Sequence, residues 1–145
     1  MITIERSALV PYSADQMYAL VDDVSQYPQF MQGCIAAEVV SRTPDVLIGK
    51  LTLGKAGLRY SFTTRNLLTP GERMDMTLVE GPFRSFSATW HFKALAADAS
   101  KVSLVMHFEW AGGLLGAAME KLFQHSANSL VDEVVNRAQK VYGVK

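Results

Sequence analysis

Apolar and polar residues alternate along most of the middle of the chain. In residues 102–110, for example, Val102, Leu104 and Met106 share one phase, and His107 lies on the other. A period of two is typical of antiparallel strands that pack on one face and meet solvent on the other. Short segments rich in glycine or proline separate the alternating runs and are typical of turns: Thr43-Pro44-Asp45, Gly54-Lys55-Ala56-Gly57, Thr69-Pro70-Gly71 and Glu80-Gly81-Pro82.

The N-terminal residues show a different pattern, a strand followed by a capped helix. Pro11 cannot donate a hydrogen bond to a neighbouring strand, so the first strand is expected to end there. Ser13 and Gln16 have the spacing of a capping box, in which two side chains satisfy the free amide groups at a helix start. Met17 and the apolar residues 19–21 then supply the buried stripe of a short helix.

After Gly112-Gly113 the hydrophobic period becomes helical. Apolar residues recur at steps of three and four over residues 114–142, and Gly143 stands where a left-handed cap belongs. Such a helix is about 43 Å long at ~1.5 Å per residue, and it must cover the apolar face of the sheet. The patterns together predict an α+β, helix-grip fold: a curved antiparallel sheet of six to seven strands around a long C-terminal helix, with short helices after the first strand.

Length and composition fit one globular domain over residues 1–145, which we expect in the cytoplasm. No apolar run reaches the ~18 residues of a membrane span, and no signal peptide is recognisable. One cysteine cannot form an internal disulfide, which is typical of a reducing compartment. The 14 Lys and Arg residues balance the 14 Asp and Glu residues, so the net charge of zero argues against a DNA-binding protein.

The inward phase of the strands carries bulky, flat or flexible side chains with few polar groups. Enclosed between a curved sheet and a helix, such side chains suit a hydrophobic ligand with a polar head. Each of them taken singly is more often ordinary core, because aromatic residues and methionine commonly fill interiors. The architecture therefore carries the ligand hypothesis, and we expect a cavity lined by Tyr60, Phe62, Met76, Trp90, Met106, Phe108, Trp110, Leu115, Met119 and Phe123.

The entrance to this cavity is predicted at two loops. Gly112 and Gly113 join the last strand to the long helix, and glycine restricts the backbone least of all residues. Phe83 and residues 27–34, with Phe30 as a plug, are expected on the opposing rim. The alternative is that the two glycines only make the sharp turn into the helix.

No catalytic or metal-binding constellation stands out in the sequence. His91, His107 and His125 are not spaced with Cys34 as metal ligands, and the alternation points the first two histidines outward. The inward phase offers hydroxyl and indole groups but no carboxylate, arginine or histidine for acid–base chemistry. We therefore expect no catalytic residue, no metal and no required cofactor.

Several motifs together resemble a known family: Arg6 to Tyr18, Asp23-Val24-x-x-Tyr27-Pro28-x-Phe30, Phe62-Thr63-Thr64-Arg65-Asn66 and Glu80-Gly81-Pro82-Phe83. Nearly the whole chain is similar to the bacterial ribosome association toxins and coenzyme Q-binding proteins. They form a START-like group within the polyketide cyclase/dehydrase superfamily. The resemblance implies a helix-grip fold with a lipid- or quinone-sized cavity. It also implies two roles: binding ubiquinone in support of respiration, and binding the large ribosomal subunit so that the subunits do not join.

Three functional hypotheses follow. The first is a non-catalytic carrier of ubiquinone or another isoprenoid lipid. The second is a toxin that inhibits translation by binding the large ribosomal subunit, with Arg59 and Arg65 as candidate phosphate contacts, although a solvated sheet face explains both arginines more simply. The third is an aromatase/cyclase-type enzyme, which ranks last because it needs ionisable groups inside the cavity.

Overall fold

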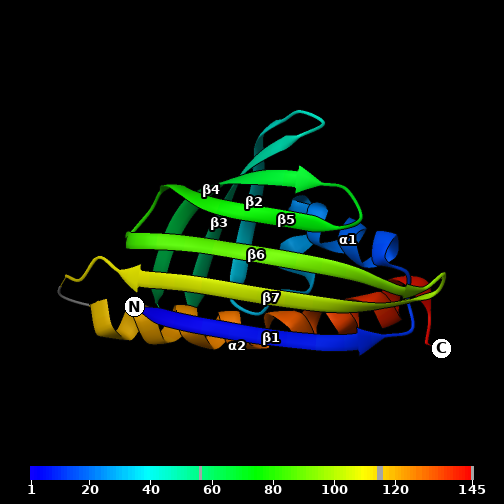
Figure 1. Cartoon of the computed structure of the whole chain (residues 1–145). Helices are drawn as coiled ribbons and strands as arrows, with labels where there is room; N and C mark the ends of the chain where they lie inside the picture. Colours follow the sequence, from blue (N-terminus) through cyan, green and yellow to red (C-terminus); the bar gives the residue numbers. More distant parts are fainter. Residues whose placement is uncertain (56, 114–115, 145) are drawn as a thin grey trace.

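A computed structural model of the chain describes residues 1–55, 57–113 and 116–144. The strands form one seven-stranded antiparallel sheet in the order β1-β7-β6-β5-β4-β3-β2 (Figure 1). From β2 to β7, strands that are consecutive in the sequence pair with each other, and β1 pairs with β7. The strand bounds are β1 (Ile2–Val10), β2 (Cys34–Arg42), β3 (Val46–Lys55), β4 (Leu58–Thr69), β5 (Arg73–Glu80), β6 (Phe83–Ala96) and β7 (Ala99–Trp110).

The helices are α1 (Ala14–Asp22), the 3-10 helix η1 (Val24–Gln29) and α2 (Gly116–Tyr142). The predicted capping box at the start of α1 is confirmed, because Ser13 and Gln16 each bond the other's backbone amide at 3.0 Å. Gly143 has a φ of +90° directly after α2, which is the left-handed cap that the sequence predicts. The expected first residues of the long helix, Leu114 and Leu115, lie outside the described residues.

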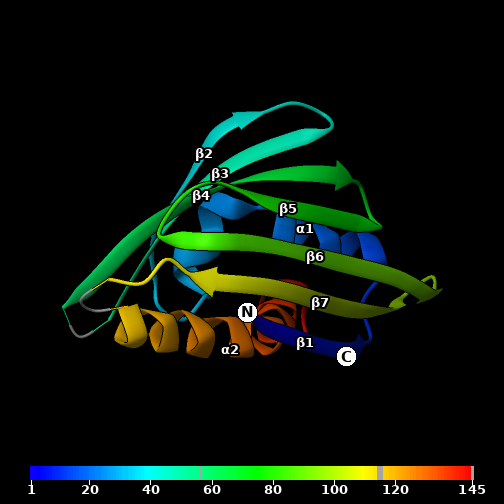
Figure 2. The same ribbon diagram turned by 60° about the vertical axis from the view of Figure 1, so that its left-hand side comes forward.

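The sheet curves around α2, and this arrangement confirms the predicted helix-grip fold. Figure 2 shows β2, β3 and β4 rising away from the helix while β1 and β7 stay beside it. The inward phase of the strands is buried, including Trp90, Leu104 and Phe108, whereas Arg59 and Arg65 are exposed on the outward phase. The predicted alternation of the strands is therefore in the correct register, and the core lies between the sheet and the helices.

The C-terminal end of α2 is fastened to the start of α1. The Tyr142 hydroxyl donates to the Gln16 carbonyl at 2.8 Å, and the Tyr12 hydroxyl donates to the Gly143 carbonyl at 2.5 Å. Ser100, which is fully buried in β7, donates to the Tyr12 carbonyl at 2.9 Å. These three hydrogen bonds fix the C-terminal end of α2 relative to α1 and the sheet.

Candidate functional site

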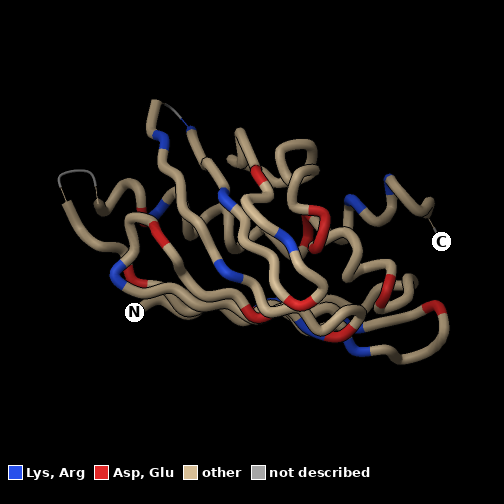
Figure 3. Tube along the Cα trace, turned by 90° about the horizontal axis from the view of Figure 1, so that it is seen from above, with Lys and Arg blue, Asp and Glu red and all other residues tan. Residues whose placement is uncertain are grey.

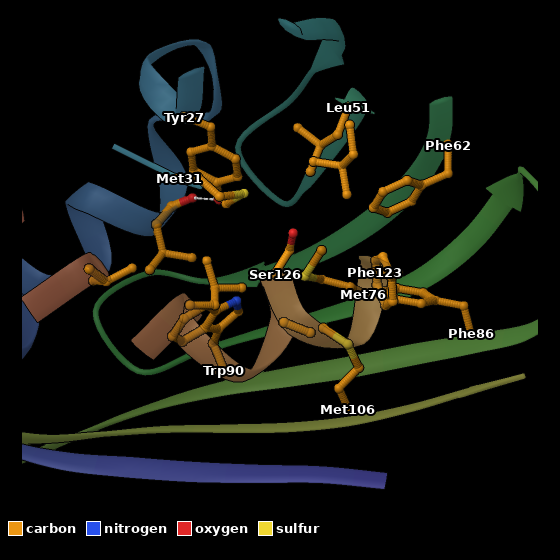
Figure 4. A pocket seen from close by; sticks show the side chains of 15 residues that line it. Tyr27, Met31, Leu51, Phe62, Met76, Phe86, Trp90, Met106, Phe123 and Ser126 are labelled. Atoms are coloured by element: carbon orange, nitrogen blue, oxygen red, sulfur yellow. Dashed lines mark hydrogen bonds between the residues drawn. The ribbon is translucent and has the colours of Figure 1, made fainter. Parts of the chain in front are cut away.

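A cavity of about 50 Å³ lies between the concave face of the sheet and α2 (Figure 4). Five strands, α1, η1 and α2 all contribute to its wall. The lining residues are Val21, Tyr27, Met31, Leu51, Leu53, Phe62, Met76, Phe86, Trp90, Met106, Phe123, Ser126, Ala127, Leu130 and Val134.

The position of the cavity follows from side-chain size. The helix presents the small residues Ser126 and Ala127 to the sheet, so it leaves space that a longer side chain would fill. The sheet side of the wall carries Met76 and Met106, whose cross-strand partner is in each case Ala88. Methionine is flexible and adapts to irregular gaps, so this part of the wall can change shape at low cost.

An aromatic cluster closes one side of the cavity. The Phe123 ring from α2 packs edge-on against Phe83 and Phe108 at centroid distances of 4.9 and 4.8 Å. The Phe83 ring also contacts Phe62 at 5.4 Å and Trp110 at 5.0 Å. Edge-to-face pairs at these distances stabilise beyond the area they bury, so this side of the cavity is rigid compared with the methionine side.

The wall contains three polar side-chain groups: the Tyr27 hydroxyl, the Trp90 indole N–H and the Ser126 hydroxyl. The Tyr27 hydroxyl donates to the Val21 carbonyl, and burial raises the pKa of Tyr27 far above its ordinary value. Trp90 and Ser126 have no hydrogen-bond partner among residues 1–55, 57–113 and 116–144. None of the described wall residues is acidic or basic.

The segment after η1 forms a further wall, and a single carboxylate ties it to α2. The Gln32 backbone amide donates to Glu133, and the Ser129 hydroxyl donates to the other carboxylate oxygen at 2.9 Å. Burial raises the pKa of Glu133 above its ordinary value, although both hydrogen bonds oppose that rise. Because Met31 precedes Gln32 and lines the cavity, Glu133 holds this wall in place.

Five of the residues expected at the cavity line it: Phe62, Met76, Trp90, Met106 and Phe123. Three others, Tyr60, Phe108 and Trp110, are buried in the aromatic cluster beside the cavity and outside its wall. Met119 is half-buried on α2 and is likewise absent from the wall, and Leu115 lies outside the described residues. The inward phase was therefore assigned correctly, but it could not show where along that phase the space opens.

The residues expected at the rim occupy different places. Phe83 is 6% exposed and sits at the centre of the aromatic cluster, so it cannot serve as a rim. Phe30 is half-buried, packs edge-on against Tyr27 and lies under the Arg137 guanidinium, outside the cavity wall. Tyr27 and Met31, from the same expected segment, do line the cavity.

Gly112 and Gly113 are exposed, with φ of +90° and +104°. No atom lies within 4 Å of a Cβ built at either position. This backbone region disfavours residues with a side chain, so the turn itself requires both glycines, as in the simpler alternative that the sequence left open. A gate at this turn stays a prediction.

The sequence reasoning missed Val21 of α1, the wall residues of β3, Phe86 of β6 and every wall residue of α2 except Phe123. Ser126 and Ala127 gave no signal of their own, because small residues on a helix face are common. Leu130 and Val134 belong to the helical stripe that the sequence did reveal, and the strand pattern included Leu51. These positions could have been found by asking which stripe residues face the middle of the sheet.

Comparison with known proteins places the chain in a family. Residues 10–135 match the model of the polyketide cyclase/dehydrase and lipid transport family. The ribosome association toxin RatA of Pseudomonas aeruginosa is 41% identical over 140 residues, which cover 97% of each chain. The chain belongs to this family. Within it, the chain belongs to the group that contains RatA and the coenzyme Q-binding proteins.

Two other known proteins are more distantly similar to the chain. The mitochondrial coenzyme Q-binding protein COQ10 of Dictyostelium discoideum is 19% identical over 147 residues, covering 99% of this chain and 72% of that protein. The crystal structure of the Zhui aromatase/cyclase from Streptomyces sp. R1128 superposes with a TM-score of 0.83 at 19% identity, covering 96% and 94% of the two chains. At this identity the structural match shows the shared fold alone.

Cys34 is the one cysteine of the sequence, and it does not line the cavity. Burial raises the pKa of the Cys34 thiol to about 11, which keeps it protonated and unreactive at neutral pH. Within the described part of the chain, no group of three or more His, Cys, Asp or Glu residues could hold a metal ion. None of the described helices is both long and apolar enough to cross a membrane.

The outward face of the sheet carries the two arginines that the ribosome hypothesis singles out. Arg59 and Arg65 are both exposed on β4, and Lys50 on β3 pairs with Thr63 between them. Figure 3 shows basic and acidic positions interspersed along the chain, in keeping with its zero net charge. These basic residues of β3 and β4 therefore share the outward face of the sheet.

Proposed function

We propose that the protein binds a hydrophobic small molecule between its sheet and α2, in a non-catalytic role in the cytoplasm. One observation carries the proposal: fifteen of the described residues line the cavity, and twelve of them have purely apolar or thioether side chains. Apolar walls with a few polar groups are typical of small-molecule sites. The family's description as lipid transport proteins supports the same function.

The ligand class that we propose is an isoprenoid quinone or a similar lipid. The relationship to a protein named for coenzyme Q binding supports this class. A cavity of about 50 Å³ is much smaller than the ~300–1,000 Å³ of typical ligand pockets, so binding requires the wall to move. Met31, Met76 and Met106 are the flexible wall residues that can move without breaking a hydrogen bond.

Lipid extraction and native mass spectrometry of protein purified from its own cells test this function. The Ala127→Leu variant fills the cavity from the helix side, because Ala127 is buried and lines the wall. Ala118→Leu is the matched control on the exposed face of α2. We expect a co-purifying lipid with the natural protein and with Ala118→Leu, and a loss of that lipid with Ala127→Leu. Equal lipid content in both variants would contradict the proposed site.

A second candidate function is association with the ribosome, which the name of the 41% identical RatA relative favours. We propose the large ribosomal subunit as the partner and Arg59 and Arg65 as contacts to its phosphates. Both side chains are exposed, and the ion pairs among the described residues are formed by Arg42 and Arg73 instead. Exposed guanidinium groups outside an ion pair can donate hydrogen bonds to phosphate oxygens.

Cosedimentation with large subunits across a salt series tests the ribosome candidate. Each lost phosphate contact lowers the slope of log affinity against log salt by about 0.7–0.9. We expect Arg59→Ala/Arg65→Ala to bind more weakly and with a flatter slope than the natural protein. The control, Lys93→Ala/Lys101→Ala, removes two exposed charges that face each other on β6 and β7. An unchanged slope for the arginine variant would exclude this patch.

A further inference from the structure

The cavity wall holds two hydrogen-bond donors that the protein itself leaves unused. Of the three polar groups in the wall, the Tyr27 hydroxyl already donates to the Val21 carbonyl. Ser126 is 7% exposed and Trp90 is 3% exposed, and neither side chain has a hydrogen-bond partner within the described ranges. Because the other twelve described wall residues apart from Tyr27 have apolar or thioether side chains, these two donors are the groups open to a polar atom in the cavity.

Both donors line the same cavity, and they come from different elements of the fold. Ser126 projects from α2 and Trp90 comes from β6, so the cavity lies between them. In Figure 4 the Ser126 hydroxyl points away from the helix into the cavity, and the indole nitrogen lies on the edge of the Trp90 ring nearer Ser126. A group placed in this space can therefore meet a donor on the helix side and a donor on the sheet side.

Gly33 keeps the Ser126 side of this space narrow and well defined. A Cβ built at Gly33 would lie 3.0 Å from the Ser126 Oγ, and the φ of Gly33 is +84°. The segment that Glu133 ties to α2 therefore passes close to the hydroxyl without covering it by a side chain.

We infer that Ser126 and Trp90 form a head-group site that selects apolar ligands bearing a neutral hydrogen-bond acceptor, such as a ring carbonyl oxygen. The indole N–H can only donate, so the ligand atom beside Trp90 must accept. The described wall has no cation to compensate a buried carboxylate or phosphate, so a charged head is excluded by its desolvation cost. This inference rests on the proposed binding of a hydrophobic molecule and adds which chemical class the site selects.

A matched pair of probes separates the head-group site from apolar binding in general. The pair is 2,3-dimethyl-1,4-naphthoquinone and 2,3-dimethylnaphthalene, which share a ring shape and differ in the two carbonyl groups. Equilibrium dialysis measures both affinities for the natural protein, Ser126→Ala and Trp90→Phe. Ser87→Ala is the control, because Ser87 is exposed on the outward face of β6.

We expect each of Ser126→Ala and Trp90→Phe to weaken quinone binding about three- to tenfold relative to the hydrocarbon, which is the effect of one hydrogen bond. Ser87→Ala should change neither affinity. The ratio of the two affinities cancels any change in cavity size that the variants cause. In infrared difference spectra the carbonyl stretch of the bound quinone should lie lower with the natural protein than with Ser126→Ala.

Two results would overturn the inference and are distinguishable from each other. If both probes bind and the variants leave the ratio of the two affinities unchanged, the protein binds apolar molecules, but Ser126 and Trp90 do not hydrogen-bond the ligand carbonyl groups. If neither probe binds to the natural protein, the proposed function fails as well as the head-group site.

Discussion

The backbone amide of Gln32 donates a hydrogen bond to the carboxylate of Glu133, which is 101 residues later in the chain. This contact joins the segment after η1 to the middle of α2. Met31 on one side of Gln32 lines the cavity, and Gly33 on the other side approaches Ser126. A single half-buried side chain thus determines how tightly one wall of the cavity is held.

Replacing Glu133 should loosen this wall. A hydrogen bond to a charged acceptor contributes about 1.5–3 kcal/mol, so Glu133→Ala should speed amide hydrogen exchange at Gln32 by roughly tenfold or more. Asp132→Ala is the control, because Asp132 is exposed on the next position of the helix. Equal exchange at Gln32 in the two variants would show that the carboxylate does not hold the segment.

The raised pKa of Glu133 predicts a specific pH dependence of stability. Because burial raises this pKa in the folded state above its ordinary 4.5, the folded protein binds more protons at this site than the unfolded chain. The stabilisation is complete below the ordinary value and is lost as pH rises through the folded pKa. Urea unfolding across that window should show the natural protein losing stability relative to Glu133→Gln as pH rises. The opposite slope would mean that the hydrogen bonds from Gln32 and Ser129 outweigh burial.

Phe123 should be the most costly side chain of α2 to remove. It contacts five aromatic rings of the sheet, and replacing a buried phenylalanine by alanine typically costs about 3–5 kcal/mol. Met119→Ala, one turn earlier and half-buried, is expected to cost less. Chemical denaturation measures both free energies of unfolding. A similar loss in the two variants would show that the aromatic cluster relaxes around the missing ring.

Gly81 should tolerate alanine less well than Gly57. A Cβ at Gly81 would lie 2.6 Å from the Phe62 Cβ, whereas no atom lies within 4 Å of a Cβ at Gly57. Both residues also have positive φ, +154° and +83°, so either substitution adds backbone strain. Overpacking adds about 1–3 kcal/mol, so Gly81→Ala should lower the midpoint of thermal unfolding more and should displace Phe62 at the cavity wall. Equal midpoints would indicate that β4 shifts freely at this turn.

The sequence by itself determined the elements, their order and which face of each strand is buried. The capping box at Ser13, the glycine cap at Gly143 and the period-two alternation are local signals, and each is set by neighbouring residues. A long apolar stripe also has to cover a sheet face, so the helix-grip arrangement followed from the same patterns. These features needed no knowledge of which distant residues meet.

Only the tertiary structure decided where the cavity opens and which polar groups face it. Tyr60 and Phe62 share one phase of β4, yet the first is packed in the aromatic cluster and the second lines the cavity. Whether a β4 residue lines the cavity depends on the α2 side chain opposite it, and the placement of the helix determines which side chain that is. Ser126 carries no sequence signal, because its free hydroxyl becomes meaningful only when Trp90, from a strand remote in sequence, lies across the same space. Volume between packed elements is a sum over many distant side chains, so a periodic pattern along the chain cannot locate it.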